Sequence, residues 1–391
     1  MPSTKKVLFV FGTRPEAIKL APLIKQFESR PELFETIVCV TAQHRQMLDE
    51  VLEVFSIVPD YDLNVMRENQ NLADVFCRVL QSMLAVIDKA KPDYVVVHGD
   101  TSTCFAAALA AFYTKTKVFH IEAGLRTLDL LSPFPEEMNR QMVGRIASYH
   151  FSPTDQNKQN LLREGVSEKQ ILVTGNTIVD SLEHINSWLD ESDSDLSAQI
   201  QSKLKSILSF DWRTEKFVLI TAHRRENFGQ PLANIFDSIK ILASEYPGHK
   251  FVLPLHPNPN VQEQALKSLS NIKNVDLIPA LDYLSFTELL RHCHFVMTDS
   301  GGVQEEAPSF GKRLLLLRNN TERPEGLVGG QAYMVGSDKD EILRKGRELI
   351  ETNQFDFIAL VASNPFGDGQ ASKRIVEFVI NLDLVGEEDL N

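Results

Sequence analysis

The segment "FVMTDSGGVQEEAPSFGKR", residues 295–313, is the most specific local indication of how this chain folds. FVMT has the apolar character of a strand that is covered on both faces. A turn that contains Gly301 and Gly302 follows, and the rest of the segment predicts a helix. A buried strand, a glycine turn and a helix together form the repeating unit of an α/β protein with a parallel sheet.

Similar apolar runs recur along the chain in two series, and each series predicts a parallel sheet. The first series lies at residues 7–11, 37–40, 94–98 and 118–121, and the second at 217–221, 251–255, 275–278, 295–298 and 313–317. A length of 391 residues also favours two domains over one core. The predicted fold class is therefore α/β, with two Rossmann-like parallel-sheet domains that face a cleft.

We place the predicted domain boundaries by these two series. The N-terminal Rossmann-like domain, with the acid and base residues, spans 1–180, and the C-terminal Rossmann-like domain spans 181–364. The remaining residues, 365–391, predict a turn and a closing helix that packs back towards the N-terminal domain.

Composition and charge exclude several classes of protein. A formal charge of -13 argues against a general nucleic-acid or membrane binder, because both of these partners are anionic. The four scattered cysteines are typical of reduced thiols in a cytoplasmic protein. The apolar run VLFVF is too short for a secretory signal, and no apolar stretch approaches the length of a membrane span.

One short stretch contains metal-ligand residue types. His292, Cys293 and His294 are consecutive, but no second ligand cluster at a zinc spacing accompanies them in the sequence. We therefore predict a helix end there, and neither a metal nor a cofactor.

Polar motifs follow the predicted strands, at the edge of a parallel sheet where ligands bind. In "FGTRPEAIKL", residues 11–20, Arg14 and Lys19 could face an anion, although this motif alone favours an ordinary turn with solvated basic residues. In "HGDTSTCFAAALAAF", residues 98–112, Asp100 lies either in a site or at a helix cap.

Two further motifs in the first half contain glutamates. Glu122 in "HIEAGLRT", residues 120–127, directly follows a strand, and a carboxylate buried there needs a partner. Glu136 and Glu137 in "SPFPEEMNRQ", residues 132–141, follow a proline, so a helix start explains them without any chemistry.

The second half begins with a histidine between a strand and a helix. In "TAHRRENFG", residues 221–229, His223 titrates near neutral pH and lies beside Arg224 and Arg225. A loop of solvated basic residues is the alternative.

The opening segment itself suggests a phosphate site. The N–H groups of Ser300, Gly301 and Gly302 could cradle a phosphate, and Glu305 and Glu306 could accept hydrogen bonds from ribose hydroxyls. A plain strand, turn and helix is the alternative.

Another arginine follows the next predicted strand. Arg323 lies in "RNNTERPEG", residues 318–326. The chain contains neither GxxxxGK[ST] nor GxGxxG. These observations favour a nucleoside diphosphate compound that is bound without a P-loop.

Together the motifs from "FGTRPEAIKLAP" to "DSGGVQEEAPSFGK" and "NTERPEG" resemble those of the non-hydrolysing UDP-N-acetylglucosamine 2-epimerases, in order from about residue 8 to residue 376. The resemblance implies a glycosyltransferase-B-like pair of Rossmann domains in a cytoplasmic enzyme that is usually a homodimer. It also implies the interconversion of UDP-GlcNAc and UDP-ManNAc, for bacterial surface polysaccharide synthesis.

The family reaction eliminates UDP across carbons 1 and 2, which leaves 2-acetamidoglucal, and then adds UDP back with a proton on the opposite face. Acid and base groups near carbon 2 are therefore required. The resemblance implies catalytic roles for Asp100, Glu122, Glu136 and His223, without assigning the base and the acid among the carboxylates.

The resemblance also implies how the substrate is held, with no cofactor. The implied substrate-binding residues are Arg14, Lys19, Phe286 near the uracil, Ser300, Gly301, Gly302, Glu306 and Arg323. Some bacterial members bind a second UDP-GlcNAc as an activator, which implies an allosteric role for Gln43 and Gln46.

Other functions remain compatible with this sequence. The main alternatives are a glycosyltransferase-B-type UDP-sugar transferase and an epimerase for a modified UDP-sugar. A hydrolysing epimerase that releases free ManNAc and a catalytically silent UDP-sugar sensor are the others.

Overall fold

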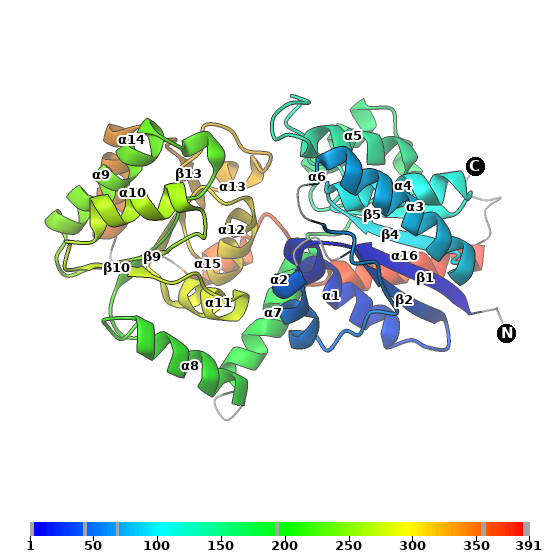
Figure 1. Ribbon diagram of the computed structural model, residues 1–391, viewed down its shortest axis with the longest axis horizontal. Helices are drawn as coiled ribbons and strands as arrows, with labels where there is room; N and C mark the ends of the chain where they lie inside the picture. The colour runs from blue at the N-terminus through cyan, green and yellow to red at the C-terminus, as the bar shows by residue number, and fades with distance from the viewer. Residues whose placement is uncertain (1–3, 42–44, 68–69, 192–194, 353–356, 386–391) are drawn as a thin grey trace. The chain divides into compact units, whose positions relative to one another are not determined.

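The computed structural model describes residues 4–41, 45–67, 70–191, 195–352 and 357–385 (Figure 1). The chain divides into two compact units. The first contains the described residues up to Ser181 and those from Phe366 onwards, and the second spans Leu182–Pro365. Each unit is built around one parallel sheet with helices between the strands, which confirms the predicted α/β fold class.

The first unit contains a seven-stranded sheet in the order β3-β2-β1-β4-β5-β6-β7, with parallel pairing throughout. The strands are β1 (Lys5–Phe11), β2 (Phe34–Val40), β3 (Tyr61–Asp62), β4 (Tyr94–His98), β5 (Lys117–Ile121), β6 (Tyr149–Ser152) and β7 (Ile171–Val173). The first predicted series corresponds to β1, β2, β4 and β5. The other three strands are short, and the sequence analysis missed them.

Helices cover both faces of this sheet (Figure 1). They are α1 (Arg14–Glu28), α2 (Arg45–Val54), α3 (Leu72–Ala90), α4 (Ser102–Tyr113), α5 (Glu136–Ile146), α6 (Asp155–Arg163), α7 (Thr177–Asp190), which continues into the second unit, and α16 (Ala371–Val385), with the 3-10 turn η1 (Glu168–Gln170). The C-terminal helix α16 packs on α1, whereas α4 lies between α3 and α5. Small buried alanines let α4 approach its neighbours closely.

The second unit contains a six-stranded parallel sheet in the order β10-β9-β8-β11-β12-β13. Its strands are β8 (Phe217–Thr221), β9 (Lys250–Pro254), β10 (Val275–Ile278), β11 (Phe295–Thr298), β12 (Leu314–Leu316) and β13 (Ala332–Met334). The second predicted series corresponds to β8 to β12. In both units the strand order reverses beside the first strand, as in doubly wound folds.

The helices of the second unit also form two groups. They are α8 (Asp195–Ile207), α9 (Gln230–Glu245), α10 (Pro259–Leu269), α11 (Tyr283–His292), α12 (Gly301–Glu306), α13 (Glu325–Val328), α14 (Lys339–Glu351) and α15 (Phe357–Ala362), with the 3-10 turns η2 (Arg225–Asn227) and η3 (Ala307–Phe310). Helix α9 packs against α10 and α14, while η3 contacts α11, α12 and α15. Within the described part of the chain, no helix combines the length and hydropathy needed to cross a bilayer.

The turn after β5 depends on a glycine. Gly124 has φ +93°, and a Cβ at this position would lie 2.3 Å from the carbonyl oxygen of Asn157 in α6. Gly165, after the end of α6, also has a positive φ of +85°, but its Cβ would meet nothing within 4 Å. A side chain at Gly165 would therefore meet backbone strain alone, whereas one at Gly124 would meet both backbone strain and steric overlap.

We predict that Gly124→Ala destabilises the protein much more than Gly165→Ala. Backbone strain alone should lower the free energy of unfolding by about 1–2 kcal/mol at Gly165. Overlap with the Asn157 carbonyl should raise that loss to about 3 kcal/mol or more at Gly124. Urea unfolding of the two variants measures the difference, and equal losses would show that the turn can relax.

Candidate active site

The carboxyl ends of β4 and β5 bring two of the predicted catalytic carboxylates to adjacent turns. His98 ends β4 beside Ile121, the last residue of β5, so Asp100 and Glu122 follow neighbouring strands. A Cβ on Gly99 would lie 3.8 Å from Oε2 of Glu122. The structure thus places both carboxylates at one edge of the first sheet.

Glu122 is a buried carboxylate with two cationic or protonatable partners. Lys19 Nζ donates to its two oxygens at 2.8 and 2.9 Å, and His98 Nε2 lies 2.9 Å from Oε2. Glu122 also has φ +62°, a conformation that is costly for a residue with a side chain and recurs at functional sites. Lys19, predicted to bind the substrate, thus lies against a predicted catalytic group.

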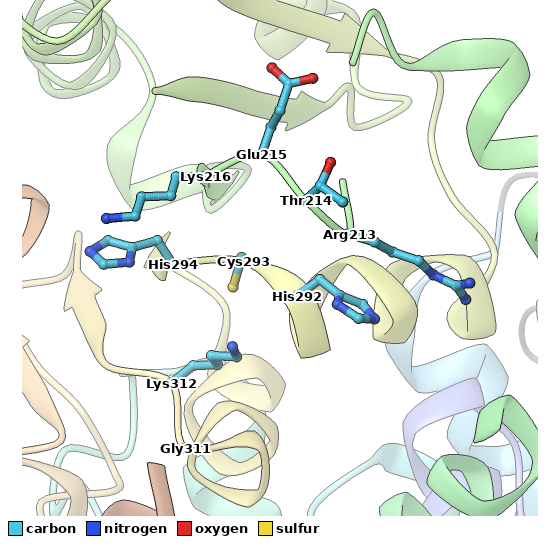
Figure 2. Close-up of a pocket in the computed structure, with 9 residues that line it drawn as sticks. All are labelled: Arg213, Thr214, Glu215, Lys216, His292, Cys293, His294, Gly311 and Lys312. Carbon is cyan, nitrogen blue, oxygen red and sulfur yellow. The ribbon is translucent and has the colours of Figure 1, made fainter. Parts of the chain in front are cut away.

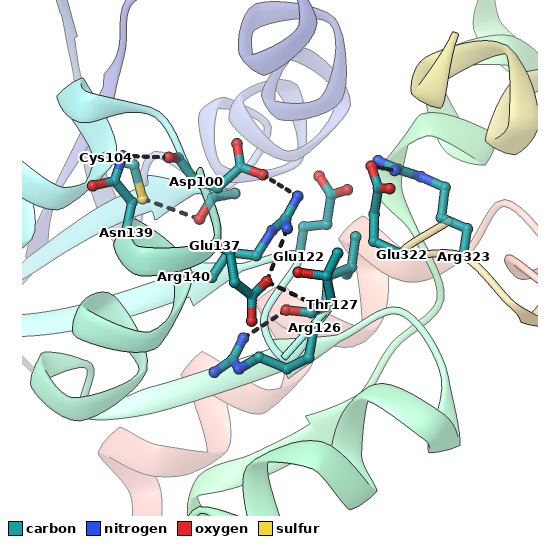
Figure 3. Close-up of polar contacts among 12 residues, drawn as sticks. Asp100, Cys104, Glu122, Arg126, Thr127, Glu137, Asn139, Arg140, Glu322 and Arg323 are labelled. Atoms are coloured by element: carbon teal, nitrogen blue, oxygen red, sulfur yellow. Dashed lines mark hydrogen bonds and ion pairs between the residues drawn. The ribbon is translucent and has the colours of Figure 1, made fainter. Parts of the chain in front are cut away.

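Asp100 is held by the first turns of α5 (Figure 3). Arg140 Nη2 lies 2.6 Å from Asp100 Oδ2, and Asn139 donates from Nδ2 to the backbone oxygen of Asp100 at 2.8 Å. Glu136, Asn139 and Arg140 are spaced three and four residues apart, so they share one helix face. Glu136 therefore lies on the face of α5 that meets Asp100.

Glu137, the next residue of α5, makes buried contacts that hold the surrounding structure in place. It is fully buried and accepts hydrogen bonds from the N–H groups of Thr127 and Leu128 at 3.0 and 3.2 Å. Arg140 Nη1 contacts the same carboxylate at 3.1 Å, so this guanidinium bridges Glu137 and Asp100. The helix-start interpretation of Glu137 accounts for its sequence position, and its buried contacts also fix the loop that follows β5.

The first turn of α1 contains a buried carboxylate that the sequence analysis missed. Glu16 accepts hydrogen bonds from the N–H groups of Gly12 at 3.1 Å and Thr13 at 2.8 Å, and from the hydroxyl of Thr101 at 2.7 Å. Burial raises the pKa of Glu16, although these hydrogen bonds oppose the rise. Arg14 extends from the same turn and forms no ion pair with any described residue.

His120 lies near this edge but has the properties of a structural residue. Its Nε2 donates to the Gly99 carbonyl at 2.8 Å, which supports the turn before Asp100. Burial lowers the pKa of His120 to about 3, so the ring is neutral at physiological pH. It is therefore unsuited to act as a cationic acid.

In the second unit, one buried aspartate organises the loop after β8. Asp299 Oδ2 accepts hydrogen bonds from the N–H groups of His223 and Arg224, both at 2.8 Å, and from Asn227 Nδ2 at 3.0 Å. Its other oxygen lies 3.5 Å from Nδ1 of His223. The His223 ring also stacks on His256, with centroids 4.9 Å apart, so both neighbours restrict its orientation.

Two guanidinium groups converge on Gly301. A Cβ there would lie 3.1 Å from Arg323 Nη1 and 3.2 Å from Arg224 Nη2. Arg323 also contacts two acids, with Nε 2.6 Å from Glu305 Oε1 and Nη1 hydrogen-bonded to Glu322. The Arg224 side chain forms no ion pair with any described residue, which leaves its charge available to an anion.

The remaining predicted residues of the second unit lie on α11 and α12. Ser300 caps α12, Gly302 lies in its first turn, and Phe286 is half-buried in α11. Glu306 is buried and accepts a hydrogen bond from the Tyr283 hydroxyl at 3.3 Å.

Two other predictions concern neighbouring regions. Gln43 and the side chain of Gln46 lie outside the described residues. His292 ends α11 and Cys293 caps it, as predicted, and no cluster of metal-ligating side chains occurs in the described part of the chain.

Several of these contacts were not predicted from the sequence. His98, Asp299, Glu16 and Tyr283 had no assigned role. The argument that drew attention to Glu122, a carboxylate directly after a buried strand, applies equally to Asp299 and could have identified it.

Residues 25–380 match the family model described as UDP-N-acetylglucosamine 2-epimerase. The chain belongs to this family. The match confirms both the resemblance found in the motifs and the predicted enzyme class, an isomerase.

Individual relatives agree with the UDP-N-acetylglucosamine 2-epimerase family match. The UDP-N-acetylglucosamine 2-epimerase of Escherichia coli strain K12 is 47% identical over 377 residues, which cover 96% of this chain and 98% of that protein. A crystal structure of UDP-GlcNAc 2-epimerase from Neisseria meningitidis bound to UDP-GlcNAc is 46% identical, with a TM-score of 0.88 over 96% of this chain and 100% of that chain. The glycotransferase of kitacinnamycin shares the fold alone, at 12% identity and a TM-score of 0.63 over 97% of this chain and 99% of that chain.

We predict stability effects of different size for the two adjacent glutamates of α5. Glu137→Gln should lower the free energy of unfolding by about 2–4 kcal/mol, because it removes a buried charge that Arg140 and two backbone N–H groups contact. Glu136→Gln, on the half-buried neighbouring position, should change it by less than about 1 kcal/mol. Urea titration of both variants tests the assignment, which equal losses would contradict.

Proposed function

We propose that this chain interconverts UDP-GlcNAc and UDP-ManNAc by inverting carbon 2 of the sugar, without releasing free ManNAc. Family membership supports this activity, as does the UDP-GlcNAc bound in the Neisseria meningitidis structure. The observation that carries the proposal is the group of carboxylates at one sheet edge of the first unit, where Asp100 and Glu122 each contact a cation.

The proposed reaction needs no external oxidant or reductant. A base removes the proton from carbon 2, the bond between carbon 1 and the diphosphate oxygen breaks, and its electron pair leaves with UDP. The sugar becomes 2-acetamidoglucal. UDP oxygen then attacks carbon 1 again while an acid delivers a proton to the opposite face of carbon 2, so atoms and electrons balance.

We propose that Asp100, Glu122 and Glu136 manage the proton at carbon 2. Asp100 forms an ion pair with Arg140, and Glu122 forms one with Lys19. A charged carboxylate is the form that can accept a proton. These ion pairs support a role for both groups as bases.

We propose that the second unit binds the nucleotide and stabilises the departing diphosphate. His223 is oriented by Asp299 and stacked on His256, and it would donate a hydrogen bond to the leaving oxygen. Arg224 and Arg323 beside Gly301 supply guanidinium groups for the phosphates. The proposed substrate-binding residues are Arg14, Lys19, Phe286, Ser300, Gly301, Gly302, Glu306 and Arg323, with Gln43 and Gln46 for an activating second UDP-GlcNAc.

The biological setting is also part of the proposal. We propose a cytoplasmic enzyme that supplies precursors for surface polysaccharides, and its four free cysteines fit a reducing compartment. We further propose a homodimer. Exposed apolar side chains on two adjacent helices, Phe112 and Tyr113 of α4 and Met142 of α5, support such an interface.

Incubation of the purified protein with UDP-GlcNAc in deuterium oxide tests the reaction. Proton NMR should show UDP-ManNAc accumulating with deuterium at carbon 2, because the abstracted proton exchanges with solvent before it is returned. Free ManNAc would indicate a hydrolysing epimerase, and transfer to an added acceptor would indicate a glycosyltransferase. Product with the original hydrogen at carbon 2 would exclude a solvent-exchanging base.

We predict that Glu136→Gln reduces exchange at carbon 2 by at least about a hundredfold, because proton transfer by a positioned side chain contributes about that much. UDP binding, measured by calorimetry, should remain within about twofold of the wild type because the proposed nucleotide site lies in the other unit. Wild-type exchange in this variant would return Glu136 to a helix-start role.

A further inference from the structure

A pocket of about 290 Å³ lies in the second unit (Figure 2). Lys216 directly precedes β8, His294 directly precedes β11, and Lys312 lies two residues before β12. These strands are parallel neighbours, so their amino ends meet at one sheet edge. The pocket is therefore separated from the candidate nucleotide site by the length of a strand, roughly 15 Å.

The lining of this pocket is rich in basic residues. Among its lining side chains are Arg213, Lys216, His292, His294 and Lys312. Glu215 is the one acidic residue of the lining, and its carboxylate points away from the other side chains (Figure 2). Such a concentration is unexpected in a chain with a formal charge of -13.

Neighbouring acids compensate only part of this charge. Glu288 contacts Arg213 Nη2 at 2.8 Å and His292 Nε2 at 3.4 Å. Burial favours its neutral form, but hydrogen bonds from His292 and Arg213 lower the pKa of Glu288 to about 2, so it carries a full charge near neutral pH. Arg213 and His292 thus have an anionic partner in the protein itself.

The two lysines differ from Arg213 and His292 in this respect. Neither Lys216 nor Lys312 forms an ion pair with any described residue. Burial lowers the pKa of His294, and the charges of both lysines lower it further, so these three groups lie within electrostatic range of one another. Like charges held together without a counter-charge repel, and a bound anion would relieve that repulsion.

We propose that this pocket binds a small phosphorylated anion, with Lys216 and Lys312 as its principal contacts. An anion with two or more charges can balance both ammonium groups, and phosphate oxygens suit the compact charge of lysine. The pocket exceeds the volume of a single phosphate group and has room for a second phosphate or a sugar. Its lining has no Phe, Tyr or Trp on which a nucleotide base could stack, which favours a ligand without a base.

Calorimetric titration of the full chain with inorganic pyrophosphate, in chloride buffer, tests this site. Saturating UDP is included in one arm, because the proposed nucleotide site could also bind pyrophosphate. We expect one pyrophosphate to bind per chain with UDP present. Lys312→Met and Lys216→Met should each weaken that binding at least about tenfold. The matched control Lys240→Met, an exposed lysine of α9, should leave it unchanged.

Three results would overturn the proposal. These are the absence of pyrophosphate binding in the presence of UDP, equal binding by the lysine variants and the wild type, and citrate binding at least as tight as pyrophosphate binding. Lys216 is exposed, so Lys216→Met should fold even if Lys312→Met does not. Repulsion between the lysines should destabilise the wild type when no phosphorylated anion is bound. A Tm of Lys312→Met in chloride buffer that equals or exceeds the wild-type Tm would support this repulsion.

Discussion

Carboxylates at the ends of buried strands are the constraint on which this structure depends. A charge in such a place is tolerated only when donors or cations surround it. Glu122 meets this requirement through Lys19 and His98, whereas Asp299 meets it through backbone N–H groups and Asn227. Each of these carboxylates fixes the loops around it, and the candidate catalytic groups of each unit are arranged on those loops.

The two units surround their buried carboxylates with different kinds of partner. In the first unit, ion pairs connect side chains from separate elements. Lys19 of α1 contacts Glu122 after β5, and Arg140 of α5 contacts Asp100 after β4. In the second unit, arginines beside Gly301 are only partly neutralised, because Arg224 forms no ion pair with the described residues. The first arrangement suits proton transfer, and the second suits the binding of an anionic leaving group.

Much of the fold was predictable because buried parallel strands are short apolar runs. Strands such as β6, with the sequence YHFS, and β7, with three residues, were missed because neither is a long apolar run. Glu122 was recognised by its position, but its partner His98 was not, since this contact depends on the strand register that pairs His98 with Ile121. The contrast between Glu136 and Glu137 also needed coordinates, because adjacent helix residues point in different directions.

The contacts of Asp299 have a consequence for how the loop after β8 can vary. Its Oδ2 accepts hydrogen bonds from the backbone N–H groups of His223 and Arg224, and every residue except proline has such a group. The shape of this loop is therefore largely independent of which side chains it carries. Evolution could exchange the residues at these positions, and with them the chemistry of the site, while the aspartate keeps the same backbone path.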